Sequence, residues 1–138
     1  MKAAEYILLT AVFVAGAFAE DSARPVLSGT WASPNDASEK LVVEQTDSGI
    51  HMQELKGNET KADYECKLDG KDCEFKEDGH PAKVSLWFNG PKLVELVTRG
   101  RNIVRRRFTL ADGGKKLVVE MSAFSNPDKS ETVEYTRQ

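Results

Sequence analysis

Short stretches of alternating apolar and polar residues recur along the chain from residue 27 to residue 138. The most regular is Ala62-Asp-Tyr-Glu-Cys-Lys-Leu68, in which every second residue is apolar. In a β-strand successive side chains point to opposite faces, so these apolar side chains would share one face. Turn-forming residues separate the stretches every eight to twelve residues, and no segment of ten or more residues shows a convincing helical period. The pattern predicts an all-β domain.

The expected strands follow one another with only short turns between them. They lie at 27–31, 41–45, 50–55, 62–68, 71–75, 84–88, 93–98, 102–110, 116–121 and 132–137. Many short antiparallel strands in simple succession must bury one face and protect their edges, and closing the sheet achieves both. We therefore expect an up-and-down β-barrel of eight to ten strands. A two-sheet sandwich has the same strand spacing and remains the alternative.

The first residues have the pattern of a secretory signal peptide. Lys2 gives a positive start, residues 6–15 form an apolar run too short to span a bilayer, and Ala17-Phe18-Ala19 is a small-x-small cleavage site. We expect cleavage before Glu20, a flexible leader at 20–26 and one barrel domain at 27–138. The mature protein is then secreted or periplasmic.

The charge balance narrows the class of partner. The chain has 19 basic and 22 acidic residues, a formal net charge of −3. This balance gives no reason to expect nucleic acid or an anionic membrane surface as the partner. No run after the signal peptide is long and apolar enough for a transmembrane helix, so no membrane span is expected.

The only two cysteines belong to one predicted hairpin. If Asp69 and Gly70 are its two loop residues, Cys66 and Cys73 face each other on neighbouring strands. Opposed positions in a hairpin have Cα atoms about 4.5–5.5 Å apart, which suits a disulfide. Because an exported protein meets an oxidising compartment, we expect a disulfide between them.

Three short motifs resemble those of known barrel families. Gly29-Thr-Trp31 opens the first strand, Lys116-Leu-Val-Val-Glu-Met121 forms a late strand, and Val133-Glu-Tyr135 lies near the C-terminus. They resemble lipocalins and fatty-acid-binding proteins, the calycin group. The chain is also similar to exported bacterial lipocalin-like domains of unassigned function, which share the Gly-Thr-Trp opening and an Asp-Gly-Lys-Asp hairpin like residues 69–72. The resemblance implies a barrel that binds a small apolar or amphipathic molecule in its interior.

The resemblance also assigns structural roles and shows departures. In lipocalins a late-strand arginine packs across the first-strand tryptophan; for Trp31, Arg137 or one of residues 105–107 is the candidate. Fatty-acid-binding proteins have a helix-turn-helix lid between their first two strands, and residues 32–40 are too few to form one. Their carboxylate clamp includes an arginine two residues before the C-terminal tyrosine. Here that position is Val133, so only Tyr135 carries over.

Candidate ligand-binding residues include an arginine in the strand at 102–110. Val104, Phe108 and Leu110 mark the apolar face of this strand, and Arg106 shares it. A buried guanidinium needs a partner, which a ligand carboxylate or an interior acid would supply. Alignment on the fatty-acid-binding pattern instead turns Arg105 inward, and a place at the rim or on the outer face is a further alternative. The other candidates for contact with a ligand are Tyr64, Phe88, Phe108, Met121 and Tyr135. A solid core is the alternative to a cavity, because small barrels occur in both forms.

Nothing in the chain has the pattern of a catalytic or metal site. His51 and His80 lie far apart, and no nucleophile motif is near either. No zinc spacing or calcium-loop pattern is present, and no cofactor is expected. We therefore expect a non-enzymatic carrier of a small hydrophobic or amphipathic molecule. The alternative is a barrel that binds an extracytoplasmic protein, such as an exported protease inhibitor, through its leader at 20–26 and its loop tips.

Overall fold

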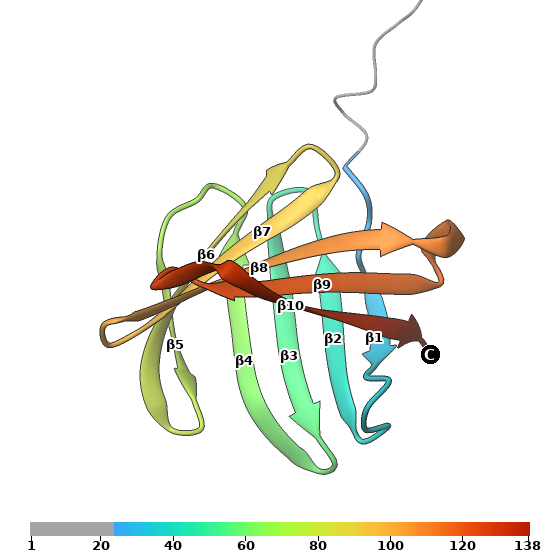
Figure 1. The fold of residues 1–138 in the computed structure, drawn as a ribbon, viewed down its shortest axis with the longest axis horizontal. Helices are drawn as coiled ribbons and strands as arrows, with labels where there is room; N and C mark the ends of the chain where they lie inside the picture. The colour runs from blue at the N-terminus through green and yellow to red at the C-terminus, as the bar shows by residue number, and fades with distance from the viewer. Residues whose placement is uncertain (1–23) are drawn as a thin grey trace, which may run out of the picture.

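Ten antiparallel strands form the barrel in a computed structural model that describes residues 24–138 (Figure 1). They are β1 (Gly29–Ala32), β2 (Glu39–Gln45), β3 (Gly49–Lys56), β4 (Glu59–Lys67), β5 (Cys73–Glu77), β6 (His80–Asn89), β7 (Lys92–Arg99), β8 (Asn102–Ala111), β9 (Lys116–Ala123) and β10 (Asn126–Arg137). A single 3₁₀ turn, η2 (Asp112–Gly114), joins β8 to β9 within these residues. The predicted all-β class is confirmed.

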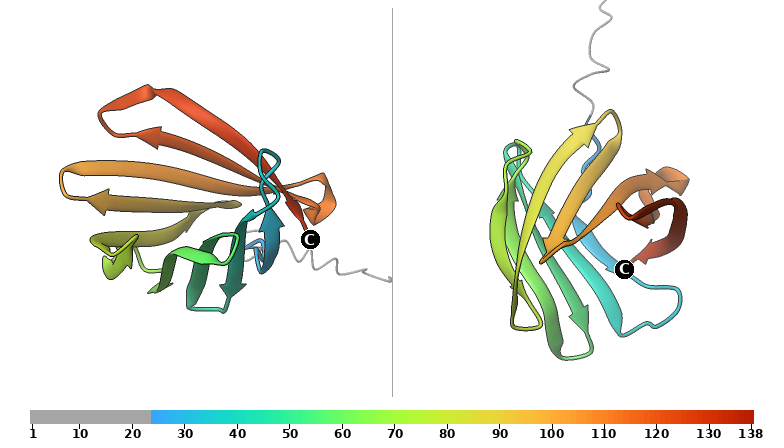
Figure 2. Two further views of the ribbon diagram at one scale, coloured as in Figure 1. Left: turned by 90° about the horizontal axis from the view of Figure 1, so that it is seen from below. Right: turned by 60° about the vertical axis from the view of Figure 1, so that its left-hand side comes forward.

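The strands close into one continuous sheet. Each pairs with the next along the chain, and β1 pairs with β10 in a register that sets Trp31 opposite Arg137. Figure 2 shows the end of β10 beside β1, with the sheet curling back on itself between them. In Figure 1, β2 to β4 run at a steep angle to β8 and β9 on the other side of the barrel. The structure is the predicted up-and-down barrel, and the sandwich alternative is wrong.

The two ends of the barrel differ in what closes them. Because neighbouring strands are antiparallel, the connections after β1, β3, β5, β7 and β9 lie at one end, here called the mouth. The other four connections lie at the opposite end, the base, together with residues 24–28 and the C-terminus. The β1–β2 connection at the mouth, residues 33–38, contains no helix. The predicted absence of a helical lid is confirmed for residues 24–138.

Several strands extend beyond their predicted ends. Asn126 to Asp128, predicted as a turn, belong to β10, where the register with β9 shifts between Asn126 and Ser130. Pro81, also placed in a turn, is the second residue of β6. Pro81 pairs with Lys76 of β5, but pairing of β6 with β7 begins only at Lys83, so Pro81 has no partner on the β7 side, where a missing N–H is tolerated.

The predicted disulfide between Cys66 and Cys73 is present, with Cα atoms 5.8 Å apart. It links β4 to β5, where the only paired residues are Ala62 and Glu77. The predicted two-residue turn at Asp69-Gly70 is wrong, because β4 ends at Lys67 and β5 begins at Cys73. The disulfide therefore joins two strands at a place where the backbone ladder does not.

Residues just before β1 pack against the base. The backbone N–H of Leu27 donates to Gln45 Oε1 at 2.8 Å, and Gln45 Nε2 donates to the carbonyl of Pro25 at 3.1 Å. Leu27 itself is buried in the core. The predicted signal peptide, and residues 20–23 of the predicted leader, lie outside the described residues. Among residues 24–138, no helix is long and apolar enough to cross a membrane.

Candidate ligand site at the barrel mouth

Arg106 lies inside the barrel and is held by two carboxylates. On β8 it shares the inner face with Phe108, which is fully buried. Its Nε and Nη2 donate to the two oxygens of Glu95 at 2.6 and 3.0 Å, and its Nη1 donates to Glu54 Oε1 at 2.6 Å. Its guanidinium also lies 5.1 Å from the centre of the Phe108 ring. The partner that a buried arginine requires is thus supplied by interior acids.

The three side chains of this ion cluster differ in how far they are exposed to solvent. The side chain of Glu95 is 0% exposed, that of Arg106 13% and that of Glu54 25%. Burial alone would lower the pKa of Arg106, but the Glu54 and Glu95 carboxylates outweigh it and raise that pKa well above its usual range. Arg106 therefore stays charged, and Glu54 is the member of the cluster nearest to solvent.

Tyr64 completes the buried side of the cluster. Its hydroxyl donates to Glu95 Oε2 and also lies 3.1 Å from the sulfur of Met52. Burial, followed by the charge of Glu95, raises the pKa of Tyr64 well above its ordinary value. The phenol thus remains a neutral donor, and its ring packs against Phe75 with centroids 5.0 Å apart. Tyr64 stabilises the Glu95 carboxylate from below.

A pocket of about 420 Å³ opens above this cluster at the mouth. Its apolar lining residues are Leu41, Leu55, Val97, Val104, Met121 and Tyr135. Arg106 and Glu54 also line it, while Glu95 does not reach its surface. Ligand pockets commonly combine apolar walls with a few polar groups, in volumes of roughly 300–1,000 Å³. The mouth pocket therefore has the size and chemistry of a small-molecule site.

The rim of the mouth pocket carries charges of both signs, largely in pairs. Arg99 donates to both oxygens of Glu77, at 2.5 and 2.6 Å. Lys56 lies 3.7 Å from Glu39, and Lys61 lies 3.6 Å from Asp78 and 2.8 Å from Glu59. These three cations therefore have carboxylate neighbours, whereas Lys40, which also lines the pocket, forms no ion pair found within residues 24–138.

Tyr135 and Met121 are predicted ligand-binding residues that line the mouth pocket. Burial raises the pKa of Tyr135, Arg106 opposes the rise, and Glu54 adds to it. No hydrogen bond of the Tyr135 hydroxyl is found within residues 24–138. Met121 is 38% exposed, more than a core residue would be, because it lies where the pocket meets solvent.

The other predicted ligand-binding residues lie elsewhere. Tyr64 and Phe108 are buried in the core and Phe88 packs against it, and none of the three lines the mouth pocket. Arg105 alternates with Arg106 and lies on the outer face, where it lines a small cleft with Arg107 and Glu120. Of the two arginines that sequence reasoning left open, Arg106 is the inner one.

The base is closed by Trp31 and Arg137. The Trp31 indole is fully buried and donates from Nε1 to the carbonyl of Leu27 at 3.0 Å. Arg137 lies over the ring at 4.2 Å and donates to the carbonyls of Ser28 and Gly114, each at 2.9 Å. Gly29, at φ +152°, lets this arginine approach, because an added Cβ would lie 2.5 Å from its Nη1. The Gly-Thr-Trp motif at the start of β1 thus contributes to the packing that closes the base of the barrel.

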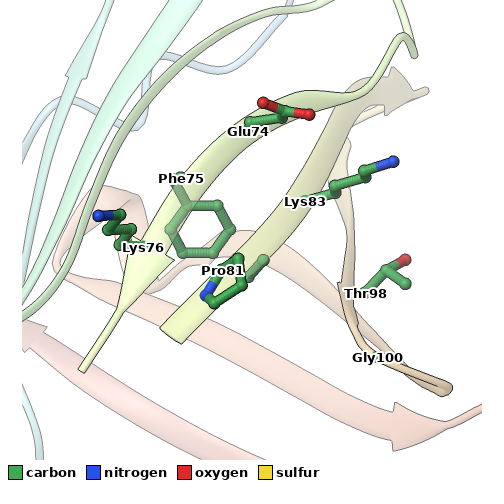
Figure 3. A pocket seen from close by; sticks show the side chains of 8 residues that line it. Glu74, Phe75, Lys76, Pro81, Lys83, Thr98 and Gly100 are labelled. Atoms are coloured by element: carbon green, nitrogen blue, oxygen red, sulfur yellow. The ribbon is translucent and has the colours of Figure 1, made fainter. Parts of the chain in front are cut away.

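A second, larger hollow lies on the outer surface over β5 and β6, with a volume of about 600 Å³. Figure 3 shows Lys76 and Lys83, two of its lining residues, extending to opposite sides. Glu74, on β5, lies opposite Lys83 on the neighbouring strand β6. The charged groups of this hollow do not converge on one point, and we regard the mouth pocket as the candidate site.

Sequence reasoning missed Glu95 and Glu54, although the pattern contained their signal. Glu95 stands between Leu93 and Val97 on the inner face of β7, and Glu54 continues the inner face of β3 after Met52. An acid in the apolar register of one strand, with an arginine in the apolar register of another, predicts an interior ion pair. The register brings the two together, since Glu95 pairs directly with Arg106 across β7 and β8.

The two histidines lie apart from this cluster. His51 Nε2 lies 2.6 Å from Asp63 Oδ1 on the outer face, and His80 is exposed at the start of β6. No group of three or more His, Cys, Asp or Glu side chains arranged to hold a metal occurs within residues 24–138.

Comparisons with known proteins find similarity in structure alone. No protein-family model matches the chain, and none of the curated proteins matches its sequence significantly. A secretory abundant heat soluble (SAHS) protein from Ramazzottius varieornatus has a TM-score of 0.66 at 12% identity, over 80% of this chain and 94% of that one. SAHS protein 4 from the same organism has a TM-score of 0.61 at 13% identity, over 81% and 94%. The fluorescent protein UnaG has a TM-score of 0.57 at 20% identity, over 80% and 96%.

These identities are low, so the matches establish the fold and not a function. The predicted resemblance to exported bacterial domains is not tested by them and stays a prediction. The motifs at the two ends of the chain led to the expectation of a barrel, and the ten strands do close into one. The chain shares the barrel fold of these structures, the kind of fold that its resemblance to fatty-acid-binding proteins implies, with ten strands and no helical lid among residues 24–138.

Proposed function

We propose that this protein is an exported, non-enzymatic carrier that binds a small apolar or amphipathic molecule in the mouth pocket. The observation that carries the proposal is the pocket itself, about 420 Å³ with six apolar lining residues above a buried ion cluster. An apolar part of a ligand would bury surface against Val104, Met121 and Tyr135. Its polar end would meet the floor formed by Arg106 and Glu54.

Export is supported by the predicted signal peptide and by the disulfide between Cys66 and Cys73. Disulfides persist mainly in oxidising compartments. The base of the barrel is filled by side chains, in agreement with the solid-core alternative, but the mouth is not. A protein-binding barrel needs no such pocket, so occupancy of the mouth separates the two functions.

The proposal is tested by filling the pocket from one position on β8. Val104→Trp places a large side chain into the pocket, whereas Ile103→Trp places the same side chain on the outer face of the same strand. Binding of a neutral, polarity-sensitive fluorescent dye should weaken by about tenfold or more in Val104→Trp and stay unchanged in Ile103→Trp. Thermal unfolding of both variants checks that each is folded.

Native mass spectrometry of the purified protein complements the variants by detecting a co-purifying molecule. Equal dye affinity in Val104→Trp and the unmodified protein would place the ligand outside the mouth. If, in addition, no small molecule co-purifies and no dye or lipid is taken up, the carrier function is wrong.

A further inference from the structure

The floor of the mouth pocket carries an excess of negative charge. Arg106 contributes one positive charge, and Glu54 and Glu95 each contribute one negative charge within hydrogen-bonding distance of it. Tyr64 and Tyr135 are neutral, since burial raises the pKa of both hydroxyls. The formal sum over the floor is therefore −1.

Arg106 has little left to offer a ligand. Of its five N–H groups, one from Nε, one from Nη2 and one from Nη1 are directed to the two carboxylates. A ligand carboxylate would have to displace Glu54, or become a third carboxylate around one guanidinium. In a partly desolvated site, like charges at such distances repel strongly.

Glu54 is placed to receive a cation instead. Its Oε1 is held by Arg106, and its Oε2 takes part in no hydrogen bond or ion pair found within residues 24–138. It is one-quarter exposed and lines the mouth pocket. A carboxylate fixed at one oxygen and open at the other is a preorganised acceptor for an N–H donor.

An aromatic and a sulfur group line the same pocket as this acceptor. They are Tyr135 and Met121, and neither is charged. A phenol ring attracts a cation through its face and its oxygen accepts a hydrogen bond, while a polarisable thioether packs against N-alkyl groups. A positively charged headgroup would thus meet one open carboxylate oxygen in a pocket that also offers these two neutral groups.

The rim does not reverse this preference. Its cations Arg99, Lys56 and Lys61 each have a carboxylate within ion-pair distance. Lys40 also lines the pocket and forms no ion pair found within residues 24–138, but it alternates with the buried Leu41, so its side chain leaves β2 on the outer side, away from the floor. None of the four therefore supplies a free positive charge to the floor of the pocket.

We infer that the polar end of the ligand is a cation, an amine or ammonium group bound at Glu54 and Tyr135, and that free carboxylic acids are disfavoured. The inference rests on the proposed carrier function and specifies its ligand class. An interior arginine alone would suggest a binding site for an anion. Here the arginine instead holds two carboxylates in place, and one of them is open to a cation.

The test compares three probes with the same alkyl chain, namely decylammonium, decanol and decanoate, by calorimetry or dye displacement at pH 7, below their aggregation concentrations. We expect decylammonium to bind about tenfold or more tightly than decanoate, with decanol between them. The preference should shrink as salt is added. Decanoate binding as tightly as decylammonium, or more tightly, would overturn the inference while leaving the carrier function intact. If none of the three probes binds, the carrier function itself fails.

Two charge-neutralising variants locate the preference. Glu54→Gln keeps an oxygen that accepts from Arg106 but removes the charge, so the ratio of the two affinities should fall to about one. Glu134→Gln is the matched control, because Glu134 is paired with Lys116 and does not line the mouth pocket. It should retain the preference. Equal loss in both variants would assign the preference to the general charge of the protein and contradict a site at Glu54.

Discussion

The base and the mouth of this barrel use the same strands and the same alternation, yet they bury different chemistry. At the base, Leu27, Trp31 and Phe108 are almost wholly buried. Arg137 covers the Trp31 ring and is held there by its hydrogen bond to the carbonyl of Ser28. At the mouth, Glu95 and Arg106 take the inner positions below a pocket. An arginine at the exposed end of the barrel covers the base, whereas the arginine inside the mouth is held by two carboxylates and lines a pocket.

The difference assigns stability mainly to the base and, under the proposed function, binding to the mouth. Apolar packing gains free energy from every contact, so a filled base needs no further partner. A buried ion pair gains little free energy once its desolvation is counted, so the pair at the mouth is weak evidence of stability. Under the proposed function, the mouth would give up stability for chemical selectivity.

The largest effect is expected at the base. Trp31→Ala should lower the free energy of unfolding by about 3–5 kcal/mol, because it removes a fully buried ring and leaves a cavity. Urea denaturation measures the loss. Trp87→Ala is the matched control, since Trp87 is only partly buried, on the outer face of β6, and its truncation should cost about 1–2 kcal/mol. Equal losses in the two variants would contradict the assignment of the base as the stabilising end.

Much of the base could be predicted from the sequence, and less of the mouth. The Gly-Thr-Trp motif and the alternation in residues 102–110 are local signals, so they predicted a barrel and the inward side of Arg106. The identity of that arginine's partners depends on register between strands, which brings Glu95 and Glu54 to it from β7 and β3. Register is a property of the closed sheet and is not written in any one strand.

Strand ends were the other part that the sequence left uncertain. Asn126-Pro127-Asp128 has the composition of a turn, but the closed sheet extends β10 through it with a shift in register. Asp69-Gly70 has the composition of a two-residue hairpin, but the disulfide and a wider connection hold β4 and β5 there. In both cases tertiary closure outweighed local turn preference.

The second prediction concerns the buried ion pair of the mouth. Glu95→Gln should lower the free energy of unfolding by about 2–3 kcal/mol. This is less than expected for a buried arginine left without any carboxylate, because Glu54 still neutralises Arg106. Chemical denaturation measures the change.

The paired replacement Glu95→Leu with Arg106→Met removes both buried charges together. It should recover most of the stability lost in Glu95→Gln, since apolar residues often replace a buried pair without cost. Glu54 keeps its charge in this double variant and loses Arg106 as a partner, so the preference for decylammonium over decanoate should persist. A double variant less stable than Glu95→Gln would show that the pair itself stabilises the barrel, and that the mouth resembles the base more than we propose.

The smallest effect is expected at an ion pair on the outer face, between His51 and Asp63, which serves as a comparison for the buried cluster of the mouth. A hydrogen bond to Asp63 raises the pKa of His51, and the same bond lowers the pKa of Asp63. The stabilisation of a raised histidine is fully present below its unfolded pKa of about 6.5 and is lost as the pH rises through its folded pKa. Asp63 must also be ionised, so the stabilisation is lost again at acid pH, as the pH falls through the lowered pKa of Asp63.

Both side chains are more than one-third exposed, so the contribution should not exceed about 0.5 kcal/mol. The stability difference between the unmodified protein and His51→Gln should therefore be greatest near pH 5–6 and vanish at alkaline pH, in urea denaturation at several pH values. Asp63→Asn should remove the same pH dependence. A pH-dependent difference above 1 kcal/mol, or one that grows toward alkaline pH, would contradict this expectation. Exposure to solvent would then fail to explain why the outer ion pair contributes less than the buried cluster of the mouth.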